Sequence, residues 1–179
     1  LSYQVSDGMA ATAGSATLAL SGAQPVQLSG TAGNDNLTLK SAGTVTGLAG
    51  NDTLTGSALN DTLNGGAGAD VLIGKAGDDR FVASVNDGND SYEGSQGVDT
   101  YDLSATTAAA TVSLDKGTST SAQTGTDKLT TIENVIGGAG NDGLSGGAAH
   151  TIMRSIAPAV AEAQSATLTI FPPTDKKKN

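Results

Sequence analysis

The feature that most constrains this chain is an aspartate that recurs in nine-residue frames along the middle of the sequence. Each frame has Asp at its sixth position, an apolar or aromatic residue at its eighth, and in most copies Gly at its first and fourth. The sixth positions are Asp35, Asp52, Asp61, Asp70, Asp79, Asp90, Asp99, Asp127 and Asp142, and the eighth positions are Leu37, Leu54, Leu63, Leu72, Phe81, Tyr92, Tyr101, Leu129 and Leu144. A fixed period of this kind indicates a repeat architecture in which each unit packs on its neighbours.

Each frame predicts a turn followed by a very short strand. The first six residues are rich in Gly, Asn and Asp, which tolerate left-handed backbone conformations. In the last three, for example Thr53-Leu54-Thr55, the central side chain should point inward and its neighbours outward. Two units make one coil of 18 residues, so Asp52 should stack on Asp70, and Asp61 on Asp79. The period therefore predicts a solenoid with a ladder of carboxylates along each of two opposite edges.

The stacked carboxylates call for a cation. Carboxylates about 5 Å apart, the spacing of neighbouring strands, repel strongly. The predicted core is one side chain deep and aromatic residues are only 3% of the chain, so apolar burial cannot offset this repulsion. Calcium takes about 6–8 oxygen ligands, including backbone carbonyls of the kind that Gly-rich turns expose, whereas magnesium demands tighter octahedral geometry and keeps water. We therefore expect several calcium ions along the ladders, rather than a loop region that binds nothing or an acidic tail.

The frames resemble the glycine-rich nonapeptide repeat G-G-x-G-x-D-x-U-x of the RTX family, which occurs in secreted bacterial toxins, proteases and adhesins. The resemblance covers roughly Gly30 to Ser145. It implies an all-β fold, a right-handed parallel β-roll (β-solenoid) of calcium-binding repeats. It also implies that backbone carbonyls at frame positions one, three and five bind calcium together with the Asp carboxylates. In the regular block these are the carbonyls of Gly47, Ala49, Asn51, Gly56, Ala58, Asn60, Gly65, Ala67, Ala69, Gly74, Ala76 and Asp78.

Breaks in the period divide the chain into five predicted segments. Residues 1–29 form a β-hairpin or N-terminal cap, and 30–102 form the roll. Residues 103–136 are a strand insertion that rejoins the roll, 137–150 are a final repeat, and 151–179 are a C-terminal cap or a secretion-signal region. We expect the whole to be a piece of a longer protein.

Two of these segments carry a further prediction. The insertion indicates a strand pair, with Thr111 to Leu114 leading into a turn at Asp115 to Gly117. The N-terminal hairpin, with strands at Leu1 to Ser6 and Ala16 to Leu20, resembles the last two strands of bacterial cadherin-like or Ig-like repeats.

Three side chains outside the sixth positions leave alternatives open. Asp7 favours a turn over an interdomain calcium ligand. His150 favours a surface or capping role over metal binding. Glu133 is either a calcium ligand or a solvated carboxylate at a strand edge.

Several functional classes are disfavoured by composition. The chain has no Cys and one His, which excludes thiolate zinc sites and cysteine catalysis and leaves no partner set for a Ser-His-Asp triad. We find no catalytic constellation and predict that the chain is not an enzyme. A net charge of −9 disfavours nucleic acid as a partner, and no apolar run approaches the ~18 residues of a membrane span.

These observations favour a calcium-folded structural module of a large secreted or cell-surface bacterial protein, of the adhesin or surface-layer type. Such a module would be exported unfolded, by type I secretion, and made rigid by extracellular calcium. The alternative is the C-terminal calcium-binding roll of a secreted enzyme, a protease or a polysaccharide-modifying enzyme, whose catalytic domain lies outside this chain. A third hypothesis, a face that binds ice or polysaccharide, is disfavoured because the second frame position is irregular. Partners besides calcium would be other surface proteins, polysaccharide or copies of the chain itself.

Overall fold

The structure is a computed structural model that describes residues 15–18, 25–146 and 153–154, with side chains described for 25–146. All regular elements in these ranges are β-strands, and none of the described residues forms a helix that could cross a membrane. One sheet has nine strands, in the order β1 (Ser15–Leu18), β3 (Asn36–Leu39), β5 (Thr53–Thr55), β7 (Val71–Ala76), β9 (Ser91–Gln96), β13 (Gly125–Thr130), β12 (Thr118–Ser121), β11 (Ala110–Ser113) and β15 (Gly143–Ser145). The other has seven, in the order β16 (Met153–Arg154), β14 (Asn134–Ile136), β10 (Thr100–Asp102), β8 (Arg80–Val82), β6 (Thr62–Ala67), β4 (Gly43–Ala49) and β2 (Val26–Ser29).

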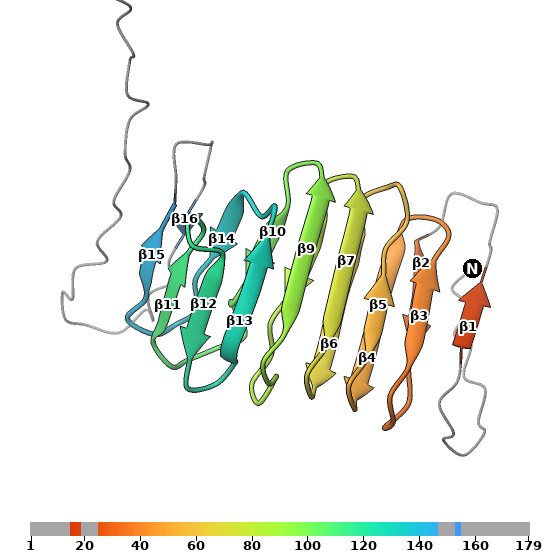
Figure 1. Cartoon of the computed structure of the whole chain (residues 1–179), viewed down its shortest axis with the longest axis horizontal. Coiled ribbons are helices and arrows are strands. Elements are labelled where there is room, and N and C mark those ends of the chain that lie inside the picture. Colours follow the sequence, from red (N-terminus) through yellow and green to blue (C-terminus); the bar gives the residue numbers. More distant parts are fainter. Residues whose placement is uncertain (1–14, 19–24, 147–152, 155–179) are drawn as a thin grey trace, which may run out of the picture.

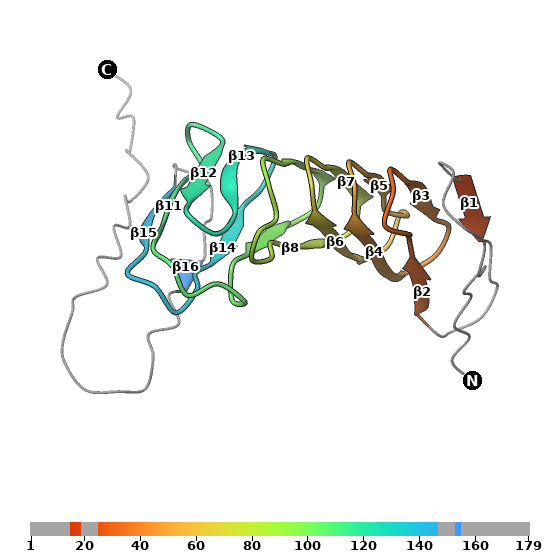
Figure 2. The ribbon, with the colours of Figure 1, turned by 90° about the horizontal axis from the view of Figure 1, so that it is seen from below.

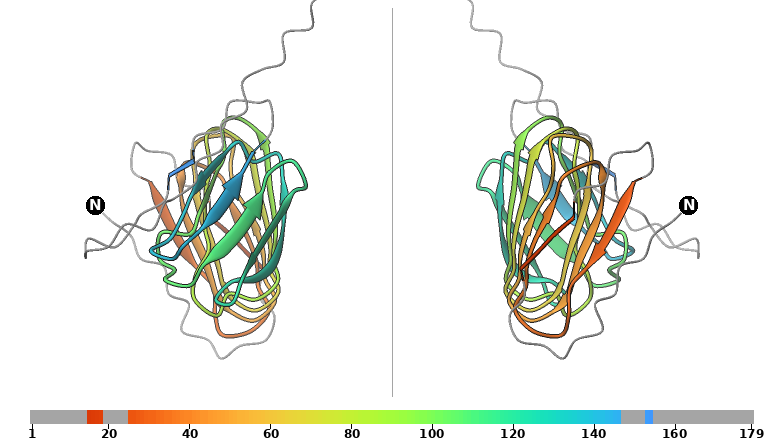
Figure 3. Two further views of the ribbon diagram at one scale, coloured as in Figure 1. Left: turned by 90° about the vertical axis from the view of Figure 1, so that its left-hand side faces the viewer. Right: turned by 90° about the vertical axis from the view of Figure 1, so that its right-hand side faces the viewer.

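From β1 to β10 the chain alternates between the two sheets, so that each coil contributes one strand to each sheet. Consecutive strands of a sheet are parallel, with Leu54 paired to Leu72 and Leu63 to Phe81. Figure 1 shows the nine-stranded sheet face-on, and Figure 2 shows the second sheet behind it as a separate layer. Viewed along the stack, the coils lie over one another as a flattened tube (Figure 3). The predicted all-β parallel roll is confirmed.

The core is a double column of eighth-position side chains between the sheets. One column holds Leu37, Leu54, Leu72, Tyr92 and Leu129, and the other holds Leu63, Phe81 and Tyr101, extended by Val45 and Val135. All of them are at most 5% exposed. The aromatic rings meet edge to face, with centroids 5.8 Å apart for Phe81–Tyr92 and 5.0 Å for Tyr92–Tyr101. Large rings thus occupy the coils that the two extra residues at 83–84 enlarge.

The insertion lies within the nine-stranded sheet. After β10 the chain forms β11 and then β12, which pair antiparallel as the sequence predicted. It returns along β13, antiparallel to β12 and parallel to β9, and so occupies the place that the next coil would have filled. β14 then stacks on β10, and β15 pairs in parallel with β11. Two added strands therefore separate β13 from β15 (Figure 1).

Some predictions fall outside the described residues. These are the first strand of the N-terminal hairpin, Asp7, His150 and the C-terminal cap apart from β16, which pairs in parallel with β14. The predicted second hairpin strand, Ala16 to Leu20, overlaps β1 at residues 16–18, and β1 pairs in parallel with β3 at the end of the roll.

Candidate metal centre

One ladder of aspartates runs along the edge where strands of the nine-stranded sheet begin. In the coils from Asp35 to Asp90 the Asp immediately precedes its strand, and its backbone N–H donates to Oδ1 of the Asp in the following coil; the last acceptor, Asp127, lies within β13. The N···O distances are 2.7 Å for Asp35 to Asp52, 2.7 Å for Asp52 to Asp70, 2.8 Å for Asp70 to Asp90 and 3.1 Å for Asp90 to Asp127. We call this series ladder one.

A second ladder runs along the edge where strands of the seven-stranded sheet begin. Its N–H···Oδ1 bonds join Gly43 to Asp61, Asp61 to Asp79 and Asp79 to Asp99, at 2.8, 2.8 and 2.9 Å. The next step is made by Glu133, whose Oε2 accepts from the Asp99 N–H at 2.9 Å. Glu133 therefore takes a place in this series, which we call ladder two. Asp142 belongs to neither ladder, and its Oδ1 accepts from Ala110 N–H of β11 at 2.9 Å.

The second carboxylate oxygen of four ladder residues, and of Asp142, is buried without a partner. Among the described residues this holds for Oδ2 of Asp52, Asp70, Asp79, Asp99 and Asp142. The first four side chains are at most 1% exposed, so water does not satisfy these oxygens at the surface. A buried, unpaired carboxylate oxygen is costly, which makes each of these positions a candidate for a bound cation.

Backbone carbonyls converge on the same places. A Cβ added to Gly47 would overlap both Asp52 Oδ2 and the carbonyl oxygen of Gly65 in the next coil. Gly65 and Gly74 hold the equivalent close approach to Asp70 and Asp79. First-position glycine is therefore required because it admits carboxylate and carbonyl oxygens side by side.

The donor set fits calcium. No compact group of three or more His, Cys, Asp or Glu side chains occurs in residues 25–146, so a cation at these rungs must draw most of its ligands from carbonyls. Carboxylate plus carbonyl oxygen is the set that calcium prefers. Within the two ladders, the residues that would hold it are Asp52, Asp70, Asp79 and Asp99, together with carbonyls of their own and adjoining turns, such as Gly65 and Gly74.

Burial also changes the titration of the ladder. Desolvation, and then repulsion from stacked neighbours, raises the pKa of Asp79 to about 7, although the backbone N–H of Asp61 works in the opposite direction. Desolvation likewise raises the pKa values of Asp52, Asp70 and Asp99 above the ordinary value. Ionisation of these aspartates is therefore unfavourable in the folded chain when no cation is bound.

An outer ladder at the fifth frame position was missed in the sequence, where these residues were expected to contribute only carbonyls. Side-chain Oδ1 atoms of Asn34, Asn51, Asn60, Asp78 and Asn89 accept backbone N–H bonds from the next coil, at 2.7–2.9 Å. All five acceptor side chains are exposed, so these hydrogen bonds hold neighbouring coils in register on the solvent side of the turns. The signal was present as the recurring Asn-Asp or Asp-Asp pair in the frames.

A buried polar cluster around the tyrosines was also missed. Tyr92 OH donates to Asp90 Oδ2 at 2.9 Å, and Tyr101 OH donates to Asp127 Oδ2 at 2.7 Å. Asp87 is fully buried beside them, and its Oδ2 accepts from the Ser84 N–H at 2.8 Å. Burial raises the pKa of Asp87 to about 7. Asp87 occupies the third frame position, where no pattern predicted an acid.

A comparison with family models agrees with this geometry. The model of the RTX calcium-binding nonapeptide repeat matches residues 46–81 and 132–150 in four copies. A search of curated proteins finds no match to the chain. The first matched stretch ends at residue 81 and the match resumes at 132, whereas the hydrogen-bonded ladders continue between them through Asp90, Asp99 and Asp127. The β-roll of these repeats is a structural calcium-binding fold rather than a catalytic one. The chain therefore carries repeats that match the RTX calcium-binding nonapeptide, and the matched repeats lie in the stacked coils of the roll.

Proposed function

We propose that this chain is a calcium-folded structural module of a large secreted or cell-surface bacterial protein, of the adhesin or surface-layer type. It is exported unfolded and becomes rigid when it meets extracellular calcium. The observation that carries the proposal is the row of buried, unpartnered carboxylate oxygens on Asp52, Asp70, Asp79 and Asp99.

The energetics favour a fold that depends on the ion. Two ionised carboxylates about 5 Å apart repel by about 3 kcal/mol at an effective dielectric constant near 20. Each half coil buries one apolar side chain in the core, which contributes about 1.5–3 kcal/mol. These two terms nearly cancel, and the entropy of ordering the turns then opposes folding. Bound calcium supplies the positive charge that turns the ladder from repulsive to attractive.

The two oxygens of each ladder carboxylate have different roles. The Oδ1 atoms of the aspartates hold neighbouring coils in register through backbone N–H donors, as in Asp52 N–H to Asp70 Oδ1. The Oδ2 atoms remain for the cation. Since one ion would contact turns of adjacent coils, its binding at one rung orders the next, and calcium uptake should be cooperative.

Far-UV circular dichroism of the full chain tests the proposal. In EDTA we expect little β signal, and on addition of calcium a cooperative gain with a midpoint of about 0.1–1 mM, the range of extracellular calcium modules. Magnesium at the same concentrations should have little effect. An unchanged spectrum across the titration, or a midpoint below about 1 µM, in the range of intracellular calcium sensors and buffers, would contradict a module that folds outside the cell.

Asp70 offers a sharper test within the same experiment. Asp70→Asn keeps the Oδ1 acceptor for the Asp52 N–H but removes the charge from an unpartnered buried oxygen. We expect the calcium midpoint to rise about tenfold or more, with lower cooperativity. The matched control is Asp115→Asn, which removes the same charge at an exposed residue between β11 and β12. Equal midpoints for the two variants would refute the ladder as the binding site.

A further inference from the structure

The ladder aspartates fall into two classes that the repeat motif does not distinguish. At Asp35 and Asp61, unlike the rungs with unpartnered oxygens, Oδ2 is already satisfied within its own turn. Asp35 Oδ2 accepts from Thr31 N–H at 2.6 Å and from Thr31 Oγ1 at 2.9 Å. Asp61 Oδ2 accepts from Ser57 N–H and Ser57 Oγ at the same two distances.

The backbone at the second frame position differs between the classes. Leu48, Gly66, Lys75 and Ser95, which precede the rungs with unpartnered oxygens, have φ angles of 86°, 96°, 84° and 75°. Thr31 and Ser57 are not among the described residues with positive φ. Rotating the peptide between positions one and two exchanges the directions of its N–H and C=O groups. The left-handed turns therefore aim their N–H groups away from the carboxylate, whereas Thr31 and Ser57 aim theirs at it.

The satisfied oxygens lie at the ends of the array. Asp35 is the first rung of ladder one in the described residues, and Asp61 is the first acidic rung of ladder two, because the preceding rung is Gly43. At the far end of ladder one, Asp90 and Asp127 receive tyrosine hydroxyls from Tyr92 and Tyr101. Unpartnered oxygens in the two ladders are thus confined to Asp52, Asp70, Asp79 and Asp99.

We infer that, within the two ladders, calcium is confined to these inner rungs, and that hydroxyl and amide donors take its place at the first acidic rung of each ladder. The inference rests on the proposed calcium-dependent fold and adds which rungs of the ladders bind calcium and which do not. In the described part of the chain, the first rungs have no acidic turn on their outer side to complete a coordination shell. Instead, Thr31 donates to the Asp35 carboxylate and Ser57 to the Asp61 carboxylate, so the first rungs are ordered by hydrogen bonds without a cation.

Two serine variants at the same frame position of ladder two provide a matched test. Ser57→Gly removes the hydroxyl and permits the left-handed turn, so Asp61 Oδ2 becomes free to bind a cation. Ser95→Gly makes the same change where the turn is already left-handed and Asp99 Oδ2 is already unpartnered. With the full chain at saturating calcium, bound metal per chain is measured after equilibrium dialysis. We expect Ser57→Gly to bind one ion more than the parent chain, and Ser95→Gly to bind the parent number.

A second pair of variants tests the inference without creating a site. Asp61→Asn should leave the number of bound ions unchanged, whereas Asp79→Asn should lower it by at least one. The inference is overturned if Asp61→Asn loses as many ions as Asp79→Asn, or if a folded Ser57→Gly chain gains none. A parent chain that binds no calcium would instead refute the proposed function, and the inference with it, so the two failures have different signatures.

Discussion

Lys75 and Leu48 occupy the second frame position with φ angles of 84° and 86°, in the left-handed region where glycine is normally found. Gly66 fills the same position of another frame at 96°. A non-glycine residue in this region costs about 1–2 kcal/mol, because its Cβ approaches the following carbonyl. Leu48 and Lys75 therefore hold a strained backbone conformation that lets the turn direct its carbonyl oxygens toward the carboxylate. The repeat consensus has glycine at this position because glycine adopts that conformation without strain.

Lys75→Gly should stabilise the calcium-loaded chain. Relief of the left-handed conformation outweighs the greater flexibility of glycine in the unfolded chain, for a net gain of about 0.5–1 kcal/mol. Lys75 is exposed, so no packing is lost. The melting temperature in excess calcium measures the effect. Lys75→Ala is the control because it removes the side chain but retains Cβ, and an equal gain in that variant would rule out backbone strain as the cause.

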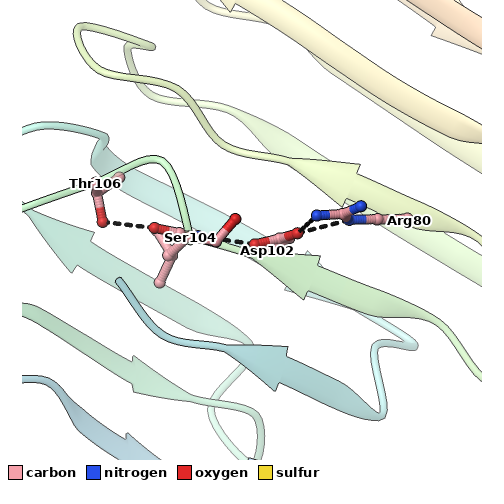
Figure 4. Close-up of polar contacts among 5 residues, drawn as sticks. Arg80, Asp102, Ser104 and Thr106 are labelled. Carbon is pink, nitrogen blue, oxygen red and sulfur yellow. Dashed lines mark hydrogen bonds and ion pairs between the residues drawn. The ribbon is translucent and has the colours of Figure 1, made fainter. Parts of the chain in front are cut away.

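Between elements, one ion pair holds the point where the chain leaves the roll for the insertion. Asp102 closes β10 and is fully buried, and it pairs with Arg80 of β8, whose side chain is 52% exposed (Figure 4). The Arg80 Nε–H donates to Asp102 Oδ2 at 2.6 Å, and the Ser104 N–H donates to Oδ1 at 2.7 Å. Two residues beyond Ser104, Thr106 Oγ1 donates to the Leu103 carbonyl at 2.8 Å. These contacts set the direction in which residues 103–109 depart from the second sheet.

Arg80→Met tests this anchor. Methionine retains an apolar stem but leaves the Asp102 carboxylate buried without a cation, at a cost on the order of 2 kcal/mol. We expect faster amide hydrogen exchange over residues 103–113 and a lower melting temperature in calcium. Lys128→Met, at an exposed position on β13, is the control. Identical exchange in the two variants would show that the ion pair does not hold the insertion.

Over the whole molecule, each ladder is a row of aspartates that repel their stacked neighbours. Desolvation, followed by repulsion between neighbours, raises the pKa values of Asp79 and Asp87 to about 7, and burial also raises those of Asp52, Asp70, Asp90, Asp99 and Asp127. In the unfolded chain these carboxyls titrate near 3.8. Between about pH 4 and pH 7 the folded, metal-free chain thus binds more protons than the unfolded chain, so its stability falls as pH rises through this window.

In EDTA the chain should therefore be more folded at pH 5 than at pH 7.5. Protons at the lower pH neutralise the ladder and replace part of what calcium does at the higher pH. In calcium the order is reversed, because protons compete with the ion for the same carboxylates. Far-UV circular dichroism and thermal melts under the four conditions measure both effects. A metal-free chain whose β signal is the same at the two pH values would contradict the raised pKa values.

The coil length, the inward side chains, the stacking of Asp52 on Asp70 and the antiparallel pair after β10 could all be predicted from the sequence. A turn of six residues and a strand of three repeat locally, and the local period determines which side chains point inward and which align. The pattern does not reveal which carboxylate oxygens are satisfied. Ser57 and Ser95 are the same residue at the same frame position, yet Ser57 N–H donates to Asp61 within its own turn, whereas Ser95 N–H donates to Thr131 Oγ1 from a later coil.

Other features depend on segments far apart in the chain. Glu133 takes the rung after Asp99 only because β11, β12 and β13 return the chain to the next place in the stack. Asp102 is tolerated in a buried position only because Arg80, in the preceding coil, lies beside it. The sequence by itself determined the repeating coil, since its interactions lie within one frame or one period. Only the tertiary structure decided where the carboxylates find protein donors, because those donors come from turns and strands whose positions no local pattern contains.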